Sequence, residues 1–231
     1  MQISIKHGLT FLANPKCGTT SIESALKGRC EINISGTKIG KHLNAHKYLK
    51  IWEPFLKSQY PRQTFFIICT TRDPISKLIS WYQYRSRSKL IRSPKYLGNT
   101  DFKEWCESKM LESTPADHFF YDHEKDKLLV DIPVPISQFK RLDHFLQRTL
   151  GSRPFRRKNE SLGFHPKSYA YNIPREQLHT IAMKTYDNLP EENLFRQSVA
   201  RHQKIEKYFQ RSKEQDLRIL SKEIKSYLQK I

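Results

Sequence analysis

The feature that most constrains this fold is an apolar run that stops in a polar loop, directly before a helical pattern. Residues 11–13 are apolar, residues 14–21 read Asn-Pro-Lys-Cys-Gly-Thr-Thr-Ser, and apolar residues recur at helical spacing from Ile22. A strand that turns tightly into a helix presents several backbone N–H groups, and the helix dipole adds positive charge there. Lys16 and the hydroxyls add donors, so the loop suits a phosphate or sulfate. The alternative is an ordinary turn whose hydroxyls cap the helix.

A second apolar run ends in the same way. Residues 65–70 are continuously apolar up to a final threonine, which is typical of a buried parallel strand, and Arg72 follows. Pro74 suits the first turn of a helix, and apolar residues then recur at helical spacing through Tyr82. Arg72 is therefore expected at the carboxyl end of a strand, where open α/β sheets bind ligands, with Ser80 on the next helix. The alternative is that Arg72 pairs with a neighbouring carboxylate and Ser80 is incidental.

Together the two blocks resemble the sulfotransferase superfamily, whose sulfuryl donor is 3′-phosphoadenosine 5′-phosphosulfate (PAPS). Pro15-Lys16-Cys17-Gly18-Thr19-Thr20-Ser21 resembles its 5′-phosphosulfate loop. Residues 72–82 resemble its 3′-phosphate motif, Arg-x-Pro-x-x-Arg-x-x-Ser-x-Tyr, with Lys77 where arginine is usual. The resemblance spans roughly residues 5–195 and is closest to the bacterial type of carbohydrate O-sulfotransferase.

The resemblance implies an α/β, P-loop-nucleotide-kinase-like three-layer fold with a central parallel sheet flanked by helices. It implies PAPS as donor, PAP as product, no required metal, and a hydroxyl acceptor that we expect to be a carbohydrate. The implied donor-binding residues are Lys16, Cys17, Gly18, Thr19, Thr20, Ser21, Arg72, Ser80 and, in a later basic loop, Arg157. For Arg157 the alternative is a flexible surface loop, and for Cys17 a simple spacer in the turn.

Two residues are the candidates for catalysis. In-line sulfuryl transfer needs a cation near the leaving phosphate, and the loop places Lys16 for that role. A histidine suits the base that takes the acceptor proton. Among nine histidines we choose His42, because Lys41-His42-Leu43-Asn44-Ala45 resembles a Lys-His-x-x-Ala segment of bacterial carbohydrate-type sulfotransferases. We expect His42 to open a helix, with His46 supporting it or solvated; the alternative is that His42 is an incidental polar residue.

The charge of the chain leaves other functions open. Lys and Arg number 41 against 23 Asp and Glu, a net charge of +18, which suits an anionic donor with an acidic acceptor, nucleic acid, or an anionic membrane. A nucleic-acid-binding protein is one alternative, although paired zinc ligands and an RNP sequence are missing. A phosphoryl-transfer kinase on a related fold is another, although the Walker A order and an evident magnesium carboxylate are missing. A donor-binding but inactive protein is a third.

Length and composition favour one domain in the cytoplasm. The 231 residues can bury one α/β core, and no apolar run approaches the length that spans a bilayer. We expect the first strand to begin within a few residues of Met1, which leaves no room for a signal peptide, and the four cysteines show no pairing pattern. We expect a sulfotransferase domain at 1–195 and a basic amphipathic helical segment at 196–231 packed on it. A coiled-coil dimer contact and a membrane contact are the alternatives for that segment.

The expected elements follow the same patterns. In the first half we expect strands at 3–12 and 64–70, and helices at 19–28, at 45–58, from 74 and at 101–111. In the second half we expect a charged surface loop at 122–127, an extended edge or bend at 132–136, and a helix at 139–150 ended by Gly151. A basic loop at 151–172 and helices from 174 complete the chain.

Overall fold

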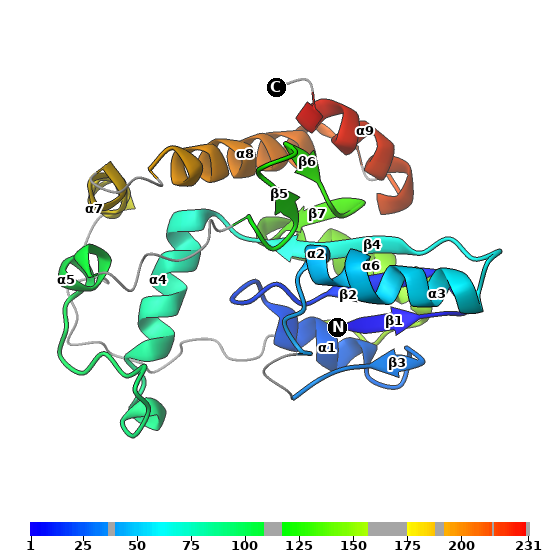
Figure 1. Cartoon of the computed structure of the whole chain (residues 1–231), viewed down its shortest axis with the longest axis horizontal. Coiled ribbons are helices and arrows are strands. Elements are labelled where there is room, and N and C mark those ends of the chain that lie inside the picture. Colours follow the sequence, from blue (N-terminus) through cyan, green and yellow to red (C-terminus); the bar gives the residue numbers. More distant parts are fainter. Residues whose placement is uncertain (37–39, 109–116, 157–174, 188–191, 214, 230–231) are drawn as a thin grey trace. The chain divides into compact units, whose positions relative to one another are not determined.

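The computed structural model (Figure 1) describes residues 1–36, 40–108, 117–156, 175–187, 192–213 and 215–229. These residues belong to two compact units. The first consists of Met1–Arg72, Asp117–Lys158 and Arg201–Ile231, and the second of Asp73–Ala116 and Asn159–Ala200. Within the described residues no helix is both long enough and apolar enough to cross a membrane. The boundary that we expected between residues 195 and 196 stays a prediction.

The first unit is built on a mixed sheet with the strand order β3-β1-β2-β4-β7. The strands are β1 (Gln2–Ser4), β2 (Leu9–Leu12), β3 (Ile32–Asn33), β4 (Phe66–Thr71) and β7 (Ile132–Pro135). β2, β4 and β7 run parallel, as expected, and β2 and β4 lie side by side (Figure 1). β1 runs antiparallel to both of its neighbours. The expectation of an entirely parallel sheet is therefore wrong, and a P-loop-like fold stays a prediction.

The difference comes from a hairpin inside the first apolar run. The expected strand at 3–12 is interrupted at Gly8, which has a φ of 56° and donates its N–H to the carbonyl of Ile5. The Ser4 hydroxyl and the His7 Nδ1 lie 3.0 Å apart and close the turn. A Cβ at Gly8 would lie 2.3 Å from the carbonyl oxygen of Thr64. Because a short turn joins β1 to β2, the two strands must be antiparallel.

The edge strand and its following helix match the expectation. β7 contains Pro133 and Pro135 and lies at one end of the strand order, where missing N–H donors are tolerated. α6 (Phe139–Leu150) ends at Gly151, which has a φ of 59°. The expected edge at 132–136 and helix at 139–150 are confirmed. Of the basic loop expected at 151–172, the described part, 151–156, has no regular secondary structure.

The helix expected at 45–58 is interrupted by a π-turn. It begins as α2 (Ala45–Lys47), capped by the Asn44 side chain, continues as the π-helical turn η1 (Tyr48–Trp52), and ends as α3 (Glu53–Gln59). The N–H of Glu53 bonds to the carbonyl of Tyr48, five residues back, instead of the residue four back. The turn therefore contains one residue more than an α-helical turn, and every side chain after it is shifted around the axis.

The remaining helices of the first unit cover the core. α1 (Thr19–Leu26) follows β2, and α9 (Leu217–Gln229) buries Leu217, Leu220, Ile224 and Leu228 among the core side chains. The apolar stripe of the C-terminal segment thus packs on its own domain as far as it is described; Ile231 lies outside the described residues.

The segment expected as a surface loop at 122–127 is instead a hairpin. β5 (Tyr121–Asp122) pairs with β6 (Lys127–Leu128), and Asp122 is buried. Its carboxylate accepts the N–H groups of Glu124 and Lys125, each at 3.1 Å, so the acidic side chain stabilises the turn. The charge pattern alone does not separate such a turn from a solvated loop.

The second unit is helical. Its helices are α4 (Pro74–Arg85), η2 (Ser88–Leu90), α5 (Phe102–Glu107), α7 (Arg175–Asp187) and the first part of α8 (Glu192–Arg211), which continues into the first unit. Asp73 caps α4 by accepting the N–H of Ser76 at 2.8 Å. The helix from residue 74 is confirmed, and the helix expected at 101–111 is present to Glu107.

Candidate functional site

The loop between β2 and α1 has two residues in the left-handed backbone region. Lys16 has a φ of 63° and Gly18, the N-cap of α1, a φ of 72°. No side-chain hydrogen bond caps this helix end, and the N–H of Ser21 bonds to the carbonyl of Gly18 at 3.1 Å. Left-handed residues that alternate along a loop turn successive N–H groups toward one side, which is the geometry of an anion-binding nest.

The loop carbonyls are tied to side chains. Thr70 Oγ1 donates to the carbonyl of Cys17 at 2.8 Å, and Arg72 Nη1 donates to that of Lys16 at 3.3 Å. The Cys17 thiol donates to the carbonyl of Pro15 at 3.3 Å. Each of these three carbonyl oxygens accepts a hydrogen bond, which partly offsets its negative partial charge. The loop carbonyls therefore repel a nearby anion less. The loop is thus electrostatically suited to a phosphosulfate.

Gly18 is held against the helix that follows the edge strand. A Cβ on Gly18 would lie 2.3 Å from Phe139 Cε2, and the Phe139 ring makes an edge contact with Phe155 at 5.3 Å between centroids. Only glycine fits both the positive φ and this close approach. Phe155 thus contacts the ring that packs against Gly18, and the described part of the basic segment ends at the next residue, Arg156.

The predicted donor residues differ in exposure. Lys16, Gly18 and Thr20 are partly exposed, while Cys17, Thr19 and Ser21 are buried. With its thiol bonded inward, Cys17 has only its backbone to offer an anion, which agrees with a spacer role for the side chain.

The other predicted donor residues lie in different parts of the molecule. Arg72 directly follows β4, as expected, and its bond to Lys16 brings it to the loop. Ser80 lies on α4, in the second unit, and is partly exposed. Arg157 lies outside the described residues. The structure thus brings Arg72 together with the loop; the joint action of Arg72 and Ser80 stays a prediction.

His42 lies beside the first residue of the loop segment. Its Nδ1 is 2.6 Å from the carbonyl oxygen of Ala13, and a carbonyl only accepts, so Nδ1 carries the proton. In the neutral ring the lone pair is then on Nε2. His42 is exposed to solvent. Partial burial lowers the pKa of His42 below 6.5; the bond to Ala13 opposes this shift, and nearby Lys41 adds to it.

The position of His42 departs from the expectation in one way. His42 precedes the helix, which begins at Ala45, so it does not open the helix. His46 Nε2 lies 3.3 Å from the carbonyl of Tyr121, and its ring stacks on His118 at 4.9 Å. Lys41 pairs with Glu23 on α1 at 3.0 Å.

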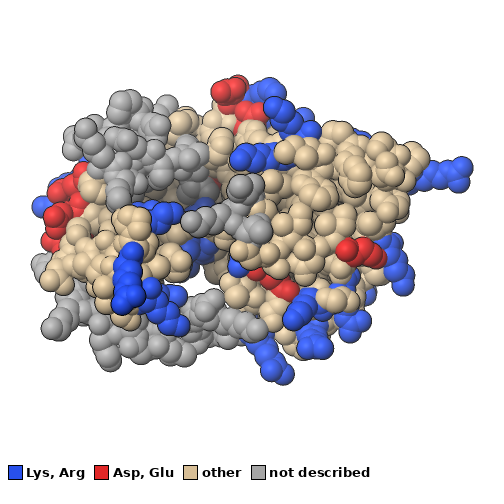
Figure 2. All heavy atoms as spheres, turned by 60° about the horizontal axis from the view of Figure 1, so that its bottom comes forward, with Lys and Arg blue, Asp and Glu red and all other residues tan. Residues whose placement is uncertain are grey.

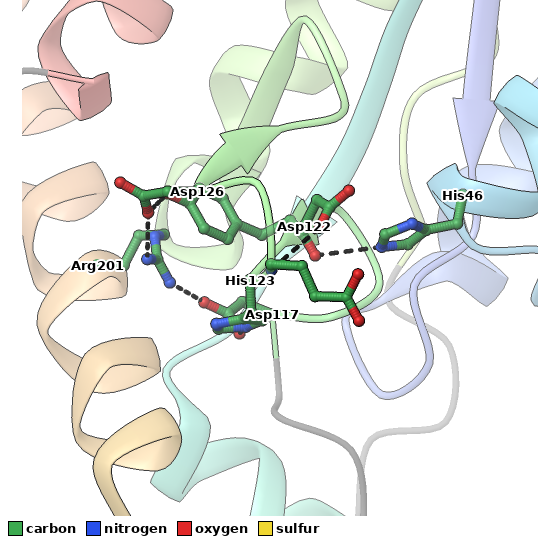
Figure 3. A network of polar contacts seen from close by, with 8 residues as sticks. His46, Asp117, Asp122, His123, Asp126 and Arg201 are labelled. Carbon is green, nitrogen blue, oxygen red and sulfur yellow. Dashed lines mark hydrogen bonds and ion pairs between the residues drawn. The ribbon is translucent and has the colours of Figure 1, made fainter.

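A second polar network lies around Asp117 (Figure 3). Asp117 accepts from His123 Nε2 at 2.7 Å and from Arg201, whose guanidinium lies 3.5 Å from the centre of the Tyr121 ring. Arg201 and His46 approach the β5–β6 hairpin from opposite sides. The charges of Asp117 and Arg201 are both largely buried and satisfy each other. The network therefore holds α8 to the hairpin, and we assign it a structural role.

Basic side chains outnumber acidic ones on part of the molecular surface. Figure 2 shows many more Lys and Arg than Asp and Glu on the face drawn. A positive field of this kind raises the local concentration of anionic ligands at any site on the surface, and it does not distinguish a sulfate donor from another polyanion.

Comparison with known proteins adds no relative. No family model matches the chain, and a search of curated proteins finds no match to its sequence. The sulfotransferase resemblance therefore rests on the motifs and their geometry.

Several residues that shape the loop were not predicted. Asn14 is buried, and its side-chain amide donates to the carbonyl of Thr70 at 3.0 Å. Asn14 and Thr70 share one recognisable signal, since each is polar at the end of an apolar strand. Phe139 carries no such signal, because its contact with Gly18 joins positions far apart in the chain.

Proposed function

We propose that this chain is a PAPS-dependent O-sulfotransferase. The observation that carries the proposal is the pairing of a nest-like loop at the start of α1 with a histidine whose Nε2 is left as the acceptor. An anion site and a proton acceptor at one strand edge are the two parts that sulfuryl transfer needs.

The donor is held by the loop and the strand ends. The backbone N–H groups of residues 16–20 and the Lys16 ammonium bind the 5′-phosphosulfate, and Thr20 adds its hydroxyl. Arg72 and Ser80 bind the 3′-phosphate, with Arg157 from the basic segment. To reach that phosphate, Arg72 exchanges its present bond to the Lys16 carbonyl for a stronger, charge-assisted one.

The reaction is one in-line displacement at sulfur. The acceptor oxygen forms a bond to sulfur while the bond from sulfur to the bridging phosphate oxygen breaks. The acceptor proton passes to Nε2 of His42, and Nδ1 keeps its own proton on the Ala13 carbonyl. Lys16 and the loop N–H groups stabilise the charge that grows on the leaving phosphate, and PAP departs.

The acceptor is a hydroxyl, and we propose a carbohydrate on the strength of the motif resemblance alone. A cytoplasmic location belongs to the same proposal. Lys41 pairs with Glu23 and has no chemical role in this proposal.

The proposal is tested by calorimetric titration with PAP, followed by transfer of labelled sulfate from PAPS to a panel of carbohydrates. We expect PAP to bind more tightly than ATP, and transfer to one acceptor class. Preference for ATP with magnesium would favour a phosphoryl-transfer kinase, and preference for a duplex oligonucleotide a nucleic-acid-binding protein. PAP binding without transfer to any acceptor would identify a donor-binding, inactive protein.

A further inference from the structure

Exposed large apolar side chains are concentrated in one short segment of the first unit. Of the five recorded for the described residues, three lie between residues 51 and 60: Ile51 is 57% exposed, Phe55 51% and Tyr60 38%. The other two, Ile91 and Ile219, lie on separate elements. An exposed cluster calls for an explanation that a single exposed side chain does not.

The π-turn produces this exposure. In an uninterrupted α-helix Phe55 would follow Tyr48 by seven residues and lie on the same, buried face. The extra residue in η1 moves Phe55 outward and gives its place to Leu56, which is fully buried. Phe55 thus lies one turn after Ile51 on the outer surface. π-Turns are uncommon and often occur at functional positions.

The surroundings of this apolar pair are basic. Lys47, Lys50, Lys57 and Arg62 are all exposed, and Glu53 is the one acidic residue between positions 44 and 64. Glu53 pairs with Lys57 at 3.2 Å. No ion pair is recorded in the described part of the chain for Lys47, Lys50 or Arg62.

We propose that the outer face of η1 and α3 docks the protein onto an anionic lipid bilayer. Ile51 and Phe55 enter the interface between headgroups and acyl chains, Tyr60 lies at headgroup level, and the cations contact lipid phosphates and carboxylates. A second copy of the chain suits this face less well, because a symmetric contact would oppose like charges. A nucleic acid would use the lysines but would leave Ile51 without an apolar partner.

The test is sedimentation of the full chain with vesicles of phosphatidylserine and phosphatidylcholine, against vesicles of phosphatidylcholine alone. We expect binding to the anionic vesicles that weakens as sodium chloride is raised. The variant Ile51→Ser/Phe55→Ser should lower the partition coefficient by about tenfold or more, and Lys47→Glu/Lys50→Glu should lower it as well. These positions are exposed, so circular dichroism and the melting temperature should be unchanged.

The matched control is Ile219→Ser, which removes a side chain that is 62% exposed on α9 and should leave binding intact. The proposal is overturned if the Ile51→Ser/Phe55→Ser variant binds anionic vesicles as the parent does, or if the control loses as much. A change of oligomeric mass in that variant would assign the face to a second copy instead. PAP affinity is measured in parallel, and because none of these residues lies in the donor site, it should not change in any variant.

Discussion

The Nδ1 of His42 lies 2.6 Å from the carbonyl oxygen of Ala13, which ties the candidate base to the residue after β2. One hydrogen bond thereby sets the tautomer of the ring and its distance from the donor loop. The bond joins the candidate base to the segment that leads into the loop, although the sequence separates His42 from Ala13 by more than twenty residues.

Replacing His42 tests the base directly. His42→Ala should lower kcat by roughly 10²–10⁴-fold, because the acceptor proton loses its acceptor. PAP affinity should change little, since the loop is not altered. Lys16→Ala is the comparison, and it should weaken both donor binding and turnover. Wild-type turnover in His42→Ala, with chemistry rate-limiting, would refute the assignment.

The pH dependence of the reaction should reflect the lowered pKa of His42. A general base works in its neutral form, so kcat/KM should fall as the pH drops through that pKa, on an acid limb below 6.5. Above the limb the base is neutral and the rate is level. The residual activity of His42→Ala should lack this acid limb. If the limb were unchanged, the titration that causes it would belong to a group other than His42.

Arg72→Ala should separate the two phosphates of the donor. We expect PAP binding to weaken by about 1.5–3 kcal/mol, because a charge-assisted contact to the 3′-phosphate is lost. Binding of adenosine 5′-phosphosulfate, which lacks that phosphate, should weaken less. Titration of both ligands measures the difference, and equal losses would mean that Arg72 acts only through its bond to the loop.

Gly18→Ala should distort the donor loop. A non-glycine residue in the left-handed region costs roughly 1–2 kcal/mol, and the new Cβ also meets the Phe139 ring. We expect weaker PAP binding and a lower melting temperature. Phe139→Leu in the same chain should recover part of the loss by relieving the clash; no recovery would place the whole effect in the backbone angle.

Arg201→Met should destabilise the fold without touching the chemistry. The change removes the cation that pairs with the buried carboxylate of Asp117, and breaking such a buried pair costs about 3–5 kcal/mol. Chemical denaturation measures the loss. The double variant Arg201→Met/Asp117→Asn should be less destabilised than the two single losses predict together, and strict additivity would mean that the pair is not coupled.

The local features of the site could be predicted from the sequence, and the long-range ones could not. Apolar runs that end in polar residues indicated the loop at 14–21 and the position of Arg72, because strand and helix patterns are local properties. The hairpin at Gly8 and the π-turn at Tyr48 escaped prediction. The hairpin reverses the chain inside one apolar run, and the π-turn adds a single residue to one helical turn; a pattern of apolar positions tolerates both.

The expected position of His42 at a helix start was wrong, while its role as a base stays a prediction. The sequence indicated a helix start at His42, and the helix begins three residues later, with Asn44 as its cap. The contact that places His42 is with a backbone carbonyl, and any residue at position 13 supplies one. Such contacts leave no signature in residue types.

The contact between Phe139 and Gly18 also bears on the order in which the protein is made. The loop belongs to the first elements that leave the ribosome, but the ring that packs behind it is synthesised some 120 residues later. Until then the backbone at Gly18 lacks its support, and the loop cannot take its final shape. Contacts of such long sequence separation form slowly. A nascent chain therefore lacks the packing of Phe139 behind Gly18 until synthesis has passed β7 and the start of α6.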